Sequence, residues 1–480
     1  MEREPASCAN AENSDETYLA QSRGMCRVCR QIVPARYKAR GGRVYLERRC
    51  PEHGNAEALV AGDLGWYLSA MQSDVASRPP PKVIGKRHAG CPHACGPCLF
   101  HGQRCQLPVI PITNACNLRC PICFGYNRAD KPYFMPAQEF ARQIDFLLEA
   151  TGGVDLINIT GGEPTLHPDL LRILEIAKRP GIGRVTLNSN GLLIGRRPEL
   201  AKALADMGIY VVLSLDTLQS ERSVRIHGVD LVADKLRALE ALETNHVQTT
   251  LLHVLIPGLN DDEMGTWLDW LCNRPFVRSL TIQTMTYTGQ GGADFLPREL
   301  LPVDLVERLI EKASGGHIAV PDFMPLPTAH PLCYGVAYLV TDEKTGVHPL
   351  ARLLDRRTLA AMAQDGYLLH PSDDTEADLK LAVDRLWSEG REPGLLQALR
   401  FMLRSVYPPG QALPMHERQR QAEQHVKTIY VHAHMDEDNY EVGRAMRCPD
   451  QVVVDGSRLI GACNFNLMYR MPDSRFGAAP

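Results

Sequence analysis

The strongest constraint on this chain is a loop with three cysteines, Cys116, Cys120 and Cys123, in the segment Thr113-Asn-Ala-Cys-Asn-Leu-Arg-Cys-Pro-Ile-Cys-Phe124. The loop follows an apolar, strand-like run from Pro108 to Thr113. Three closely spaced thiolates on a loop that leaves a strand can bind three irons of a [4Fe–4S] cluster and leave the fourth iron open. The sequence therefore predicts a cluster that can bind a small molecule at its open iron.

A second motif, Gly161-Gly162-Glu163-Pro164, ends another strand-like run, Val154 to Thr160. With both motifs in this order and spacing, the sequence resembles the radical S-adenosylmethionine (SAM) superfamily. In that superfamily the three-cysteine loop binds the cluster, and the GGEP turn receives the methionine amino group of SAM. The resemblance implies that the three loop cysteines bind iron and that Gly161, Gly162 and Glu163 contact SAM.

Between residues 108 and 289, apolar strands alternate with amphipathic helices. Because the strands are almost continuously apolar, they predict an α/β fold with a buried parallel sheet. The expected strands are Val109–Thr113, Leu156–Thr160, Arg184–Asn188, Tyr210–Leu215, Gln248–Leu255 and Ser279–Thr284. The expected helices are Pro136–Ala150, Pro168–Lys178, Pro198–Met207, Val229–Glu243 and Asp261–Cys272. A partial (β/α)6 TIM-like barrel of the radical SAM type satisfies this order, with ligands at the C-terminal ends of its strands.

Polar residues at the ends of two expected strands extend the resemblance. Asn188 and Asn190 follow the third strand, and Ser214 and Asp216 end the fourth. In the superfamily such side chains face the ribose and carboxylate of SAM, and residues 253–260 resemble the segment that packs the adenine. Each has a simpler reading, because Asn-Ser-Asn-Gly is also an ordinary turn and Ser-Leu-Asp can cap a helix. The cluster loop favours SAM binding.

The N-terminal part predicts a mononuclear metal site. Residues 1–24 are polar and are expected to be disordered. Two ligand pairs then follow on short turns, Cys26 with Cys29 and Cys50 with His53. This spacing is typical of a zinc ribbon or a rubredoxin-like knuckle. We expect zinc before iron, and a structural role before a catalytic one.

A second C-x3-C-x2-C group, Cys91, Cys95 and Cys98, precedes the first-described loop, and Cys105 follows it. Glycine and proline between the thiols allow the tight backbone that lets thiolates converge on one cluster. We expect an auxiliary iron–sulfur cluster here. The alternative is a zinc site in which Cys105 completes a set of four thiolates.

The C-terminal segment holds Cys448 and Cys463 on either side of an Asp-Gly turn, which predicts a hairpin with both thiols at its base. With Cys333 or Cys105 they can hold a further cluster, although Cys333 fits a buried structural thiol equally well. The pair His432 and His434 can bind a metal, but histidines at a strand end are more often surface polar residues.

The chain has 480 residues, 15 cysteines and a formal net charge of −4, which gives no reason to expect nucleic acid as a partner. No apolar run approaches the roughly 18–20 residues that span a bilayer, and the N-terminus lacks the apolar core of a signal peptide. We therefore expect a cytoplasmic protein without an integral membrane segment. Disulfides are rare in that compartment, so grouped cysteines indicate metal.

The expected organisation has five parts. These are a disordered tail with a metal knuckle (1–60), a linker with an auxiliary-cluster loop (61–107), the radical SAM partial barrel (108–290), a helical region (291–420) and a C-terminal auxiliary-cluster segment (421–480). Within the helical region, the expected helices are Pro302–Ala313, Glu376–Trp387 and Gly394–Val406.

Taken together, the cysteine groups from Cys26 to the terminal Cys463-Asn-Phe-Asn466 resemble the tetraether lipid synthase family of radical SAM enzymes, formerly described as pterin methyltransferases. The resemblance implies two or three [4Fe–4S] clusters, SAM and a mononuclear zinc or iron site. Two departures affect the auxiliary ligands, because Pro449 and Thr328 stand where relatives commonly have cysteine.

The resemblance implies a 5′-deoxyadenosyl radical that abstracts hydrogen, followed by carbon–carbon bond formation on a lipid or other apolar or small-molecule substrate. The alternative is sulfur insertion or methyl transfer on a soluble metabolite with the same clusters. An electron donor such as flavodoxin or ferredoxin is an expected partner. An electron-transfer or zinc scaffold protein would explain the cysteines but not the GGEP turn.

Overall fold

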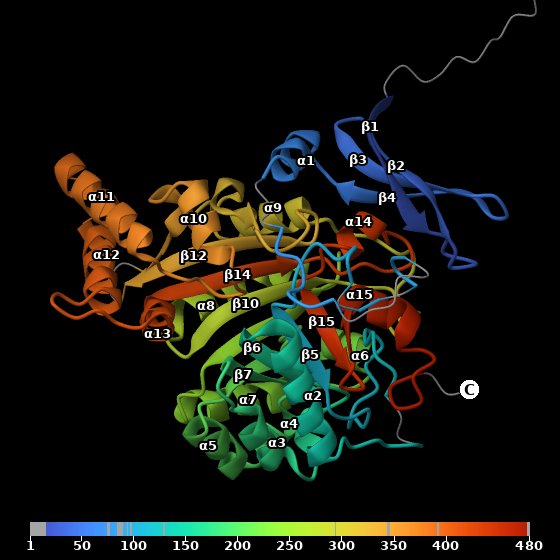
Figure 1. Ribbon diagram of the computed structural model, residues 1–480, viewed down its shortest axis with the longest axis horizontal. Coiled ribbons are helices and arrows are strands. Elements are labelled where there is room, and N and C mark those ends of the chain that lie inside the picture. The colour runs from blue at the N-terminus through green and yellow to red at the C-terminus, as the bar shows by residue number, and fades with distance from the viewer. Residues whose placement is uncertain are drawn as a thin grey trace, which may run out of the picture.

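Six parallel strands form the centre of a large sheet, in the order in which they occur along the chain (Figure 1). They are β5 (Leu107–Pro111), β6 (Val154–Thr160), β7 (Ile182–Ser189), β8 (Tyr210–Ser214), β9 (Thr249–Leu255) and β10 (Val277–Thr284). The computed structural model describes residues 16–73, 77–83, 90–93, 95–96, 98–127, 130–292, 294–342, 346–390 and 393–477. Each central strand corresponds to an expected one, so the predicted (β/α)6 core is confirmed.

Two C-terminal strands extend this parallel run at both edges. β15 (Asp450–Val454) pairs with β5, and β14 (Val426–His432) pairs with β10. Antiparallel strands lie outside them: β16 (Arg458–Gly461), β12 (Tyr334–Asp342), β11 (Met324–Pro325) and β13 (Gly346–Pro349). Strands from the three expected parts 108–290, 291–420 and 421–480 therefore join one continuous sheet.

Side chains join the two ends of the parallel run. The hydroxyl of Tyr334 on β12 donates to Asp450 on β15 at 2.5 Å, and His432 Nε2 on β14 lies 3.5 Å from the same carboxylate. The ring of Tyr334 also stacks on that of His432 with centroids 3.9 Å apart. The sheet thus curves into a barrel, whose seam is closed by these side chains and not by backbone hydrogen bonds.

Helices between the strands cover the outside of the barrel (Figure 1). They are α2 (Ala137–Thr151), α3 (Leu170–Ala177), α4 (Leu192–Arg196), α5 (Pro198–Asp206), α6 (Ser220–His227), α7 (Val232–Thr244), α8 (Met264–Asn273) and α9 (Val303–Ala313). The apolar faces of these helices, apart from α6, share one buried core with the strands, whereas Ile226 of α6 packs in a smaller cluster with Ile256 and Met285. The helices α4 and α6 were not expected, because α4 has only five residues and α6 is mostly polar, so neither shows an apolar helical period.

A second core lies outside β12. Helices α10 (Arg356–Ala363), α11 (Asp373–Glu389), α12 (Pro393–Val406) and α13 (Met415–His425) form it, and they pack on Val336, Tyr338 and Val340. Alternate residues Ala337 and Leu339 face the main core instead, so β12 separates the two cores. None of the helices in the described ranges is long and apolar enough to cross a membrane.

The N-terminal part forms a separate antiparallel sheet of β1 (Glu16–Met25), β2 (Ile32–Arg40), β3 (Arg43–Cys50) and β4 (Gly54–Ala61), followed by α1 (Leu64–Met71). The expectation of disorder is wrong for residues 16–24, because they pair along β2. Residues 1–15 lie outside the described ranges. The indole of Trp66 donates to Glu307 on α9 at 2.8 Å, which fastens this part to the barrel.

Candidate functional site

A cavity of about 1560 Å³ occupies the barrel and reaches the C-terminal ends of its strands. Its lining contains the three predicted cluster cysteines and the seven predicted SAM contacts: Cys116, Cys120, Cys123, Gly161, Gly162, Glu163, Asn188, Asn190, Ser214 and Asp216. These residues come from four strand ends that are well separated in sequence. Of the predicted adenine segment, residues 253–260, the lining contains Val254. The fold thus brings together the residues that the motifs predicted to act together.

The cysteine loop and the GGEP turn are held against each other by backbone hydrogen bonds. Gly162 N donates to Thr113 O and Glu163 N donates to Ala115 O, both at 2.7 Å. A Cβ on Gly161 would lie 2.3 Å from Thr113 O, and one on Gly162 would lie 2.3 Å from Ala115 O. Both glycines are therefore required by this close approach.

Glu163 is buried, and groups of this chain satisfy its carboxylate. Oε1 accepts from Thr165 N at 3.0 Å, Thr165 Oγ1 at 2.6 Å and Ser189 Oγ at 2.8 Å, and Oε2 accepts from Asn190 N at 2.7 Å. Asn190 in turn donates to Asn117 of the cysteine loop at 2.8 Å. The Glu163 side chain thereby ties the ends of β6 and β7 together and fixes the shape of the turn.

Lys235 is a buried residue beside this site that the sequence did not reveal. It lies on the buried face of α7, and its ammonium donates to Ser214 O at 2.6 Å. Burial lowers the pKa of Lys235, and the Asp216 carboxylate and the thiols of Cys116 and Cys120 oppose that shift. A lysine within the apolar face of the helix that was expected over Val229–Glu243 could have indicated a buried, functional cation.

The three loop thiols meet different surroundings. Cys116 and Cys120 interact with Glu163, Asp216 and Lys235, and burial raises the pKa of both thiols to about 12. Burial also raises the pKa of Cys123, while the Arg470 guanidinium opposes this shift. Such thiols ionise only with a strong cation beside them, which a bound cluster would supply.

The N-terminal pairs form a compact ligand set. Cys29 Sγ lies 3.9 Å from Cys50 Sγ, and His53 Nδ1 lies 3.6 Å from Cys26 Sγ and 3.4 Å from Cys50 Sγ. Bonds of about 2.3 Å to sulfur and 2.0–2.1 Å to nitrogen in a tetrahedron imply roughly 3.8 Å between sulfurs and 3.5 Å between sulfur and nitrogen. The four ligand atoms, all within 4.8 Å of one another, fit one tetrahedral ion.

Cys26 in this set is prepared for metal binding. Burial acts to raise the pKa of its thiol, but the backbone amides of Cys29 and Val28 lower it to about 6. A thiolate at neutral pH is the form that binds a metal ion.

The second cysteine group lies against the C-terminal residues α15 (Ala462–Asn464) and the π-helix η5 (Phe465–Tyr469). Asn464 Nδ2 donates to Cys95 Sγ at 3.3 Å, and the Tyr469 hydroxyl accepts from Cys95 N at 3.1 Å. Burial raises the pKa of Cys91 to about 12, and the nearby thiols of Cys95 and Cys98 act in the same direction. The three thiols of this group are therefore close enough to interact.

A third group consists of Cys333, Cys448 and Cys463. Cys333 directly precedes β12, Cys448 lies shortly before β15, and Cys463 follows β16. Burial raises the pKa of Cys448, and the thiols of Cys463 and Cys333 raise it further. The buried guanidinium of Arg444 donates to Cys333 Sγ at 3.3 Å, and Met435 N donates to Cys463 Sγ at 3.3 Å. The β15–β16 hairpin was predicted, but the role of Arg444 was not.

Cys105 is 4% exposed within the main core, where its thiol interacts with Asp450. A role for Cys105 as a ligand stays a prediction. His432 is buried, and burial lowers the pKa of both His432 and His434, so the surface reading of this pair is wrong for His432.

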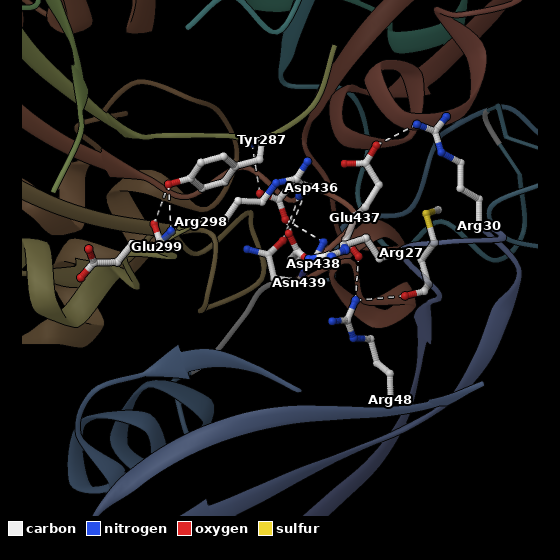
Figure 2. Close-up of polar contacts among 11 residues, drawn as sticks. Arg27, Arg30, Arg48, Tyr287, Arg298, Glu299, Asp436, Glu437, Asp438 and Asn439 are labelled. Carbon is white, nitrogen blue, oxygen red and sulfur yellow. Dashed lines mark hydrogen bonds and ion pairs between the residues drawn. The ribbon is translucent and has the colours of Figure 1, made fainter. Parts of the chain in front are cut away.

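Arginines of the N-terminal part bind the loop that follows His434, at Glu437 and Asp438 (Figure 2). Glu437 pairs with Arg30 at 2.9 Å, and its carbonyl oxygen accepts from Arg48 at 2.6 Å. Asp438 pairs with Arg27 at 3.3 Å. Arg27 and Arg30 lie in the turn that carries Cys26 and Cys29. The same loop donates from Met435 N to Cys463 Sγ, so it contacts both the mononuclear site and the third cysteine group.

Comparison with known proteins agrees with this geometry. Residues 110–271 match the family model of the Radical SAM superfamily, and residues 18–62 match the HMPTM N-terminal zinc ribbon domain. The chain is 25% identical over 480 residues to a 7,8-dihydro-6-hydroxymethylpterin dimethyltransferase of Methanocaldococcus jannaschii, with 93% of each chain covered. It is 35% identical over 214 residues to a GTP 3′,8-cyclase of Stenotrophomonas maltophilia, covering 43% of this chain and 63% of the relative.

Among solved structures, Streptococcus suis SuiB bound to S-adenosylmethionine aligns with 44% of this chain and 47% of its own. The sequence identity is 21% and the TM-score is 0.38.

Proposed function

Since this chain belongs to the radical SAM superfamily and is a radical SAM enzyme, we propose that it abstracts hydrogen from a substrate carbon and forms a carbon–carbon bond there. The observation that carries the proposal is the convergence of the three loop cysteines and the seven predicted SAM contacts on one cavity. When bound, the cluster and SAM supply a carbon-centred oxidant that removes hydrogen. The protein's own task is to hold both reactants in register and to exclude water.

The residues present fit these cofactors. Cys116, Cys120 and Cys123 would hold the cluster, and the loop supplies no fourth thiol, which leaves an iron for SAM. Because the Glu163 carboxylate is already satisfied, the backbone of the Gly161–Glu163 turn would meet the methionine amino group. Asn188, Asn190, Ser214 and Asp216 would face the ribose and carboxylate, with Lys235 as the nearby cation.

The other thiol groups would hold further metals. We assign an auxiliary [4Fe–4S] cluster to Cys91, Cys95 and Cys98 and another to Cys333, Cys448 and Cys463. We assign zinc, or iron in its place, to Cys26, Cys29, Cys50 and His53. Asn464, Arg444 and Met435 N, which donate to thiol sulfurs, would adjust the potentials of the auxiliary clusters.

The substrate is apolar or a small molecule. Typical ligand pockets measure about 300–1,000 Å³, so a cavity of about 1560 Å³ has room for SAM and a substrate together. Methyl transfer to a soluble metabolite is the second candidate, because the relative that matches 93% of the chain is named a pterin dimethyltransferase. A small electron carrier such as flavodoxin or ferredoxin would supply the electron, and the thiol-rich composition supports a cytoplasmic location.

Methyl-labelled SAM separates the two candidates. The reduced enzyme is incubated with ¹³C-methyl SAM and a metabolite and lipid extract, and the label is followed by mass spectrometry. Bond formation between substrate carbons leaves the label in methionine and gives a product without ¹³C. Label in the product, with S-adenosylhomocysteine formed, would replace our proposal with methyl transfer.

A further inference from the structure

Arg470 is a cation on the cavity wall for which the described part of the chain supplies no hydrogen-bond acceptor. Its side chain follows the π-helix η5, lines the cavity and has a buried Nε without a partner. The guanidinium carbon lies 5.5 Å from the ring centroid of Phe124 and 5.1 Å from that of Phe465. The two rings hold the guanidinium in place by cation–π contact but satisfy none of its N–H groups.

Asn466 accompanies Arg470 on the same face of this segment, four residues earlier. It also lines the cavity, and its Oδ1 is buried without a donor among the described residues. The other polar residues of the segment are engaged elsewhere, since Asn464 and Tyr469 bond the second cysteine group. π-Helical turns occur frequently at functional sites, because the extra residue redirects side chains.

The position of this pair separates it from the SAM contacts. Arg470 lies beside Cys123, because a Cβ on Gly125 would lie 2.9 Å from Arg470 Nη1 and 3.5 Å from Cys123 Sγ. Glu163, Asp216 and Lys235 instead act on Cys116 and Cys120. The carboxylates of Glu163 and Asp216 already accept hydrogen bonds from this chain. The carboxylate of Asp473 acts on Arg470, but it pairs with Arg475 at 3.0 Å. A partly buried guanidinium without a hydrogen-bond acceptor is costly unless an anion binds it.

We propose that Arg470 and Asn466 bind an oxyanion of the substrate, a carboxylate or a phosphate, on the Cys123 side of the cavity. The inference rests on the proposed function and names the substrate class for it. A guanidinium binds such groups through two parallel N–H bonds, and the buried Asn466 Oδ1 beside it can accept from a hydroxyl or a protonated oxygen of the same group. A substrate whose acidic group lies near the reacting carbon fits this arrangement better than an alkyl chain whose head group remains outside.

The test uses the full-length protein, reconstituted anaerobically and saturated with SAM. Binding of ³²P-labelled inorganic phosphate is measured by equilibrium dialysis for the wild type, Arg470→Gln, Arg470→Lys and Arg420→Gln. Arg420 is an exposed arginine on the same cavity, contributed by α13, and serves as the matched control. We expect one bound phosphate, at least about tenfold weaker binding in Arg470→Gln, partial retention in Arg470→Lys, and a change within about twofold in Arg420→Gln.

Competition identifies the source of the oxyanion. Displacement of phosphate by succinate assigns a carboxylate, by glycerol 3-phosphate a soluble phosphate ester, and by phosphatidylglycerol vesicles a lipid head group. Each of these results supports the proposal.

Undiminished phosphate binding in Arg470→Gln overturns the proposal, as does a shift in the cluster's reduction potential without a change in binding, which would assign Arg470 to the cluster. SAM cleavage by the wild type is measured in parallel. Cleavage without phosphate binding would reject this inference alone, whereas absence of cleavage would reject the proposed function.

Discussion

Gly162 faces the carbonyl oxygen of Ala115 so closely that a Cβ on residue 162 would lie 2.3 Å from that oxygen. The contact joins the two motifs that define the site, because Ala115 directly precedes the first cluster cysteine and Gly162 lies in the GGEP turn. This packing contact between the two loops therefore requires a glycine at position 162.

Gly162→Ala should therefore disturb the cluster loop. The added methyl group must displace backbone, not a flexible side chain, so we expect SAM binding to weaken by about tenfold or more and cleavage to fall in parallel. Isothermal titration with SAM and assay of 5′-deoxyadenosine measure both effects. The matched control is Gly265→Ala in α8, where the new Cβ would lie 3.8 Å from its nearest neighbour outside the helix, Ala313 O. Equal losses in both variants would contradict this account.

Lys235→Met should weaken SAM binding while preserving the cluster. The ammonium is the cation beside Ser214 and Asp216, and a methionine of similar length keeps the packing while removing the charge. We expect SAM affinity to fall by about tenfold or more, with iron content unchanged. Lys202→Met on the exposed face of α5 is the control, since its side chain is 66% exposed. Unchanged affinity in Lys235→Met would remove this residue from the site.

Cys50→Ser should release one metal ion from the N-terminal site. Three thiolates and one histidine would hold the ion, and loss of one ligand would leave too few for a closed tetrahedral site. Because Arg27 and Arg30 in the first metal turn bind the loop at Glu437 and Asp438, we also expect weaker retention of the third cluster. Elemental analysis should give one equivalent less of zinc with the SAM cluster intact. Full zinc occupancy in the variant would refute the assignment.

Glu307 should make stability depend on pH. Burial raises its pKa to about 8, although the hydrogen bond from Trp66 opposes the shift. A raised folded-state pKa means that stability is fully present below the unfolded pKa and is lost as pH rises through about 8. Between pH 6 and pH 8 the wild type should lose on the order of 2 kcal/mol of unfolding free energy from this group.

Glu307→Gln keeps an acceptor for the indole and should flatten that slope in denaturant titrations at the two pH values. A slope as steep in the variant as in the wild type would assign the effect to other groups, such as the neighbouring Asp304, whose pKa burial also raises.

The cluster loop, the GGEP turn and the six central strands were predictable from sequence because each depends on a short, local pattern. The partners of β14 and β15 were not, since each pairs with a strand far away in sequence and no local signal records that choice. The seam between Tyr334 and Asp450 joins residues 116 positions apart and was missed for the same reason.

Some functional side chains had a signal that was too weak to use. Arg444 is a single arginine in a short helix, and only the fold reveals that its guanidinium bonds Cys333 Sγ and two backbone carbonyls. Arg470 lies just beyond the last cysteine motif, where spacing carries no information about the cavity. The roles of Arg444 and Arg470 could not be predicted, because they depend on burial in the fold and not on a sequence pattern.

The central claim is that the loop around Cys120 holds a cluster that cleaves SAM. The most direct test is anaerobic reconstitution of the wild type and Cys120→Ala, with an iron count and a 5′-deoxyadenosine assay under strong reduction. We predict about twelve irons per wild-type chain from three clusters, with cleavage, and about four fewer irons without cleavage in the variant. Wild-type protein that binds zinc in this loop and leaves SAM intact would contradict the account.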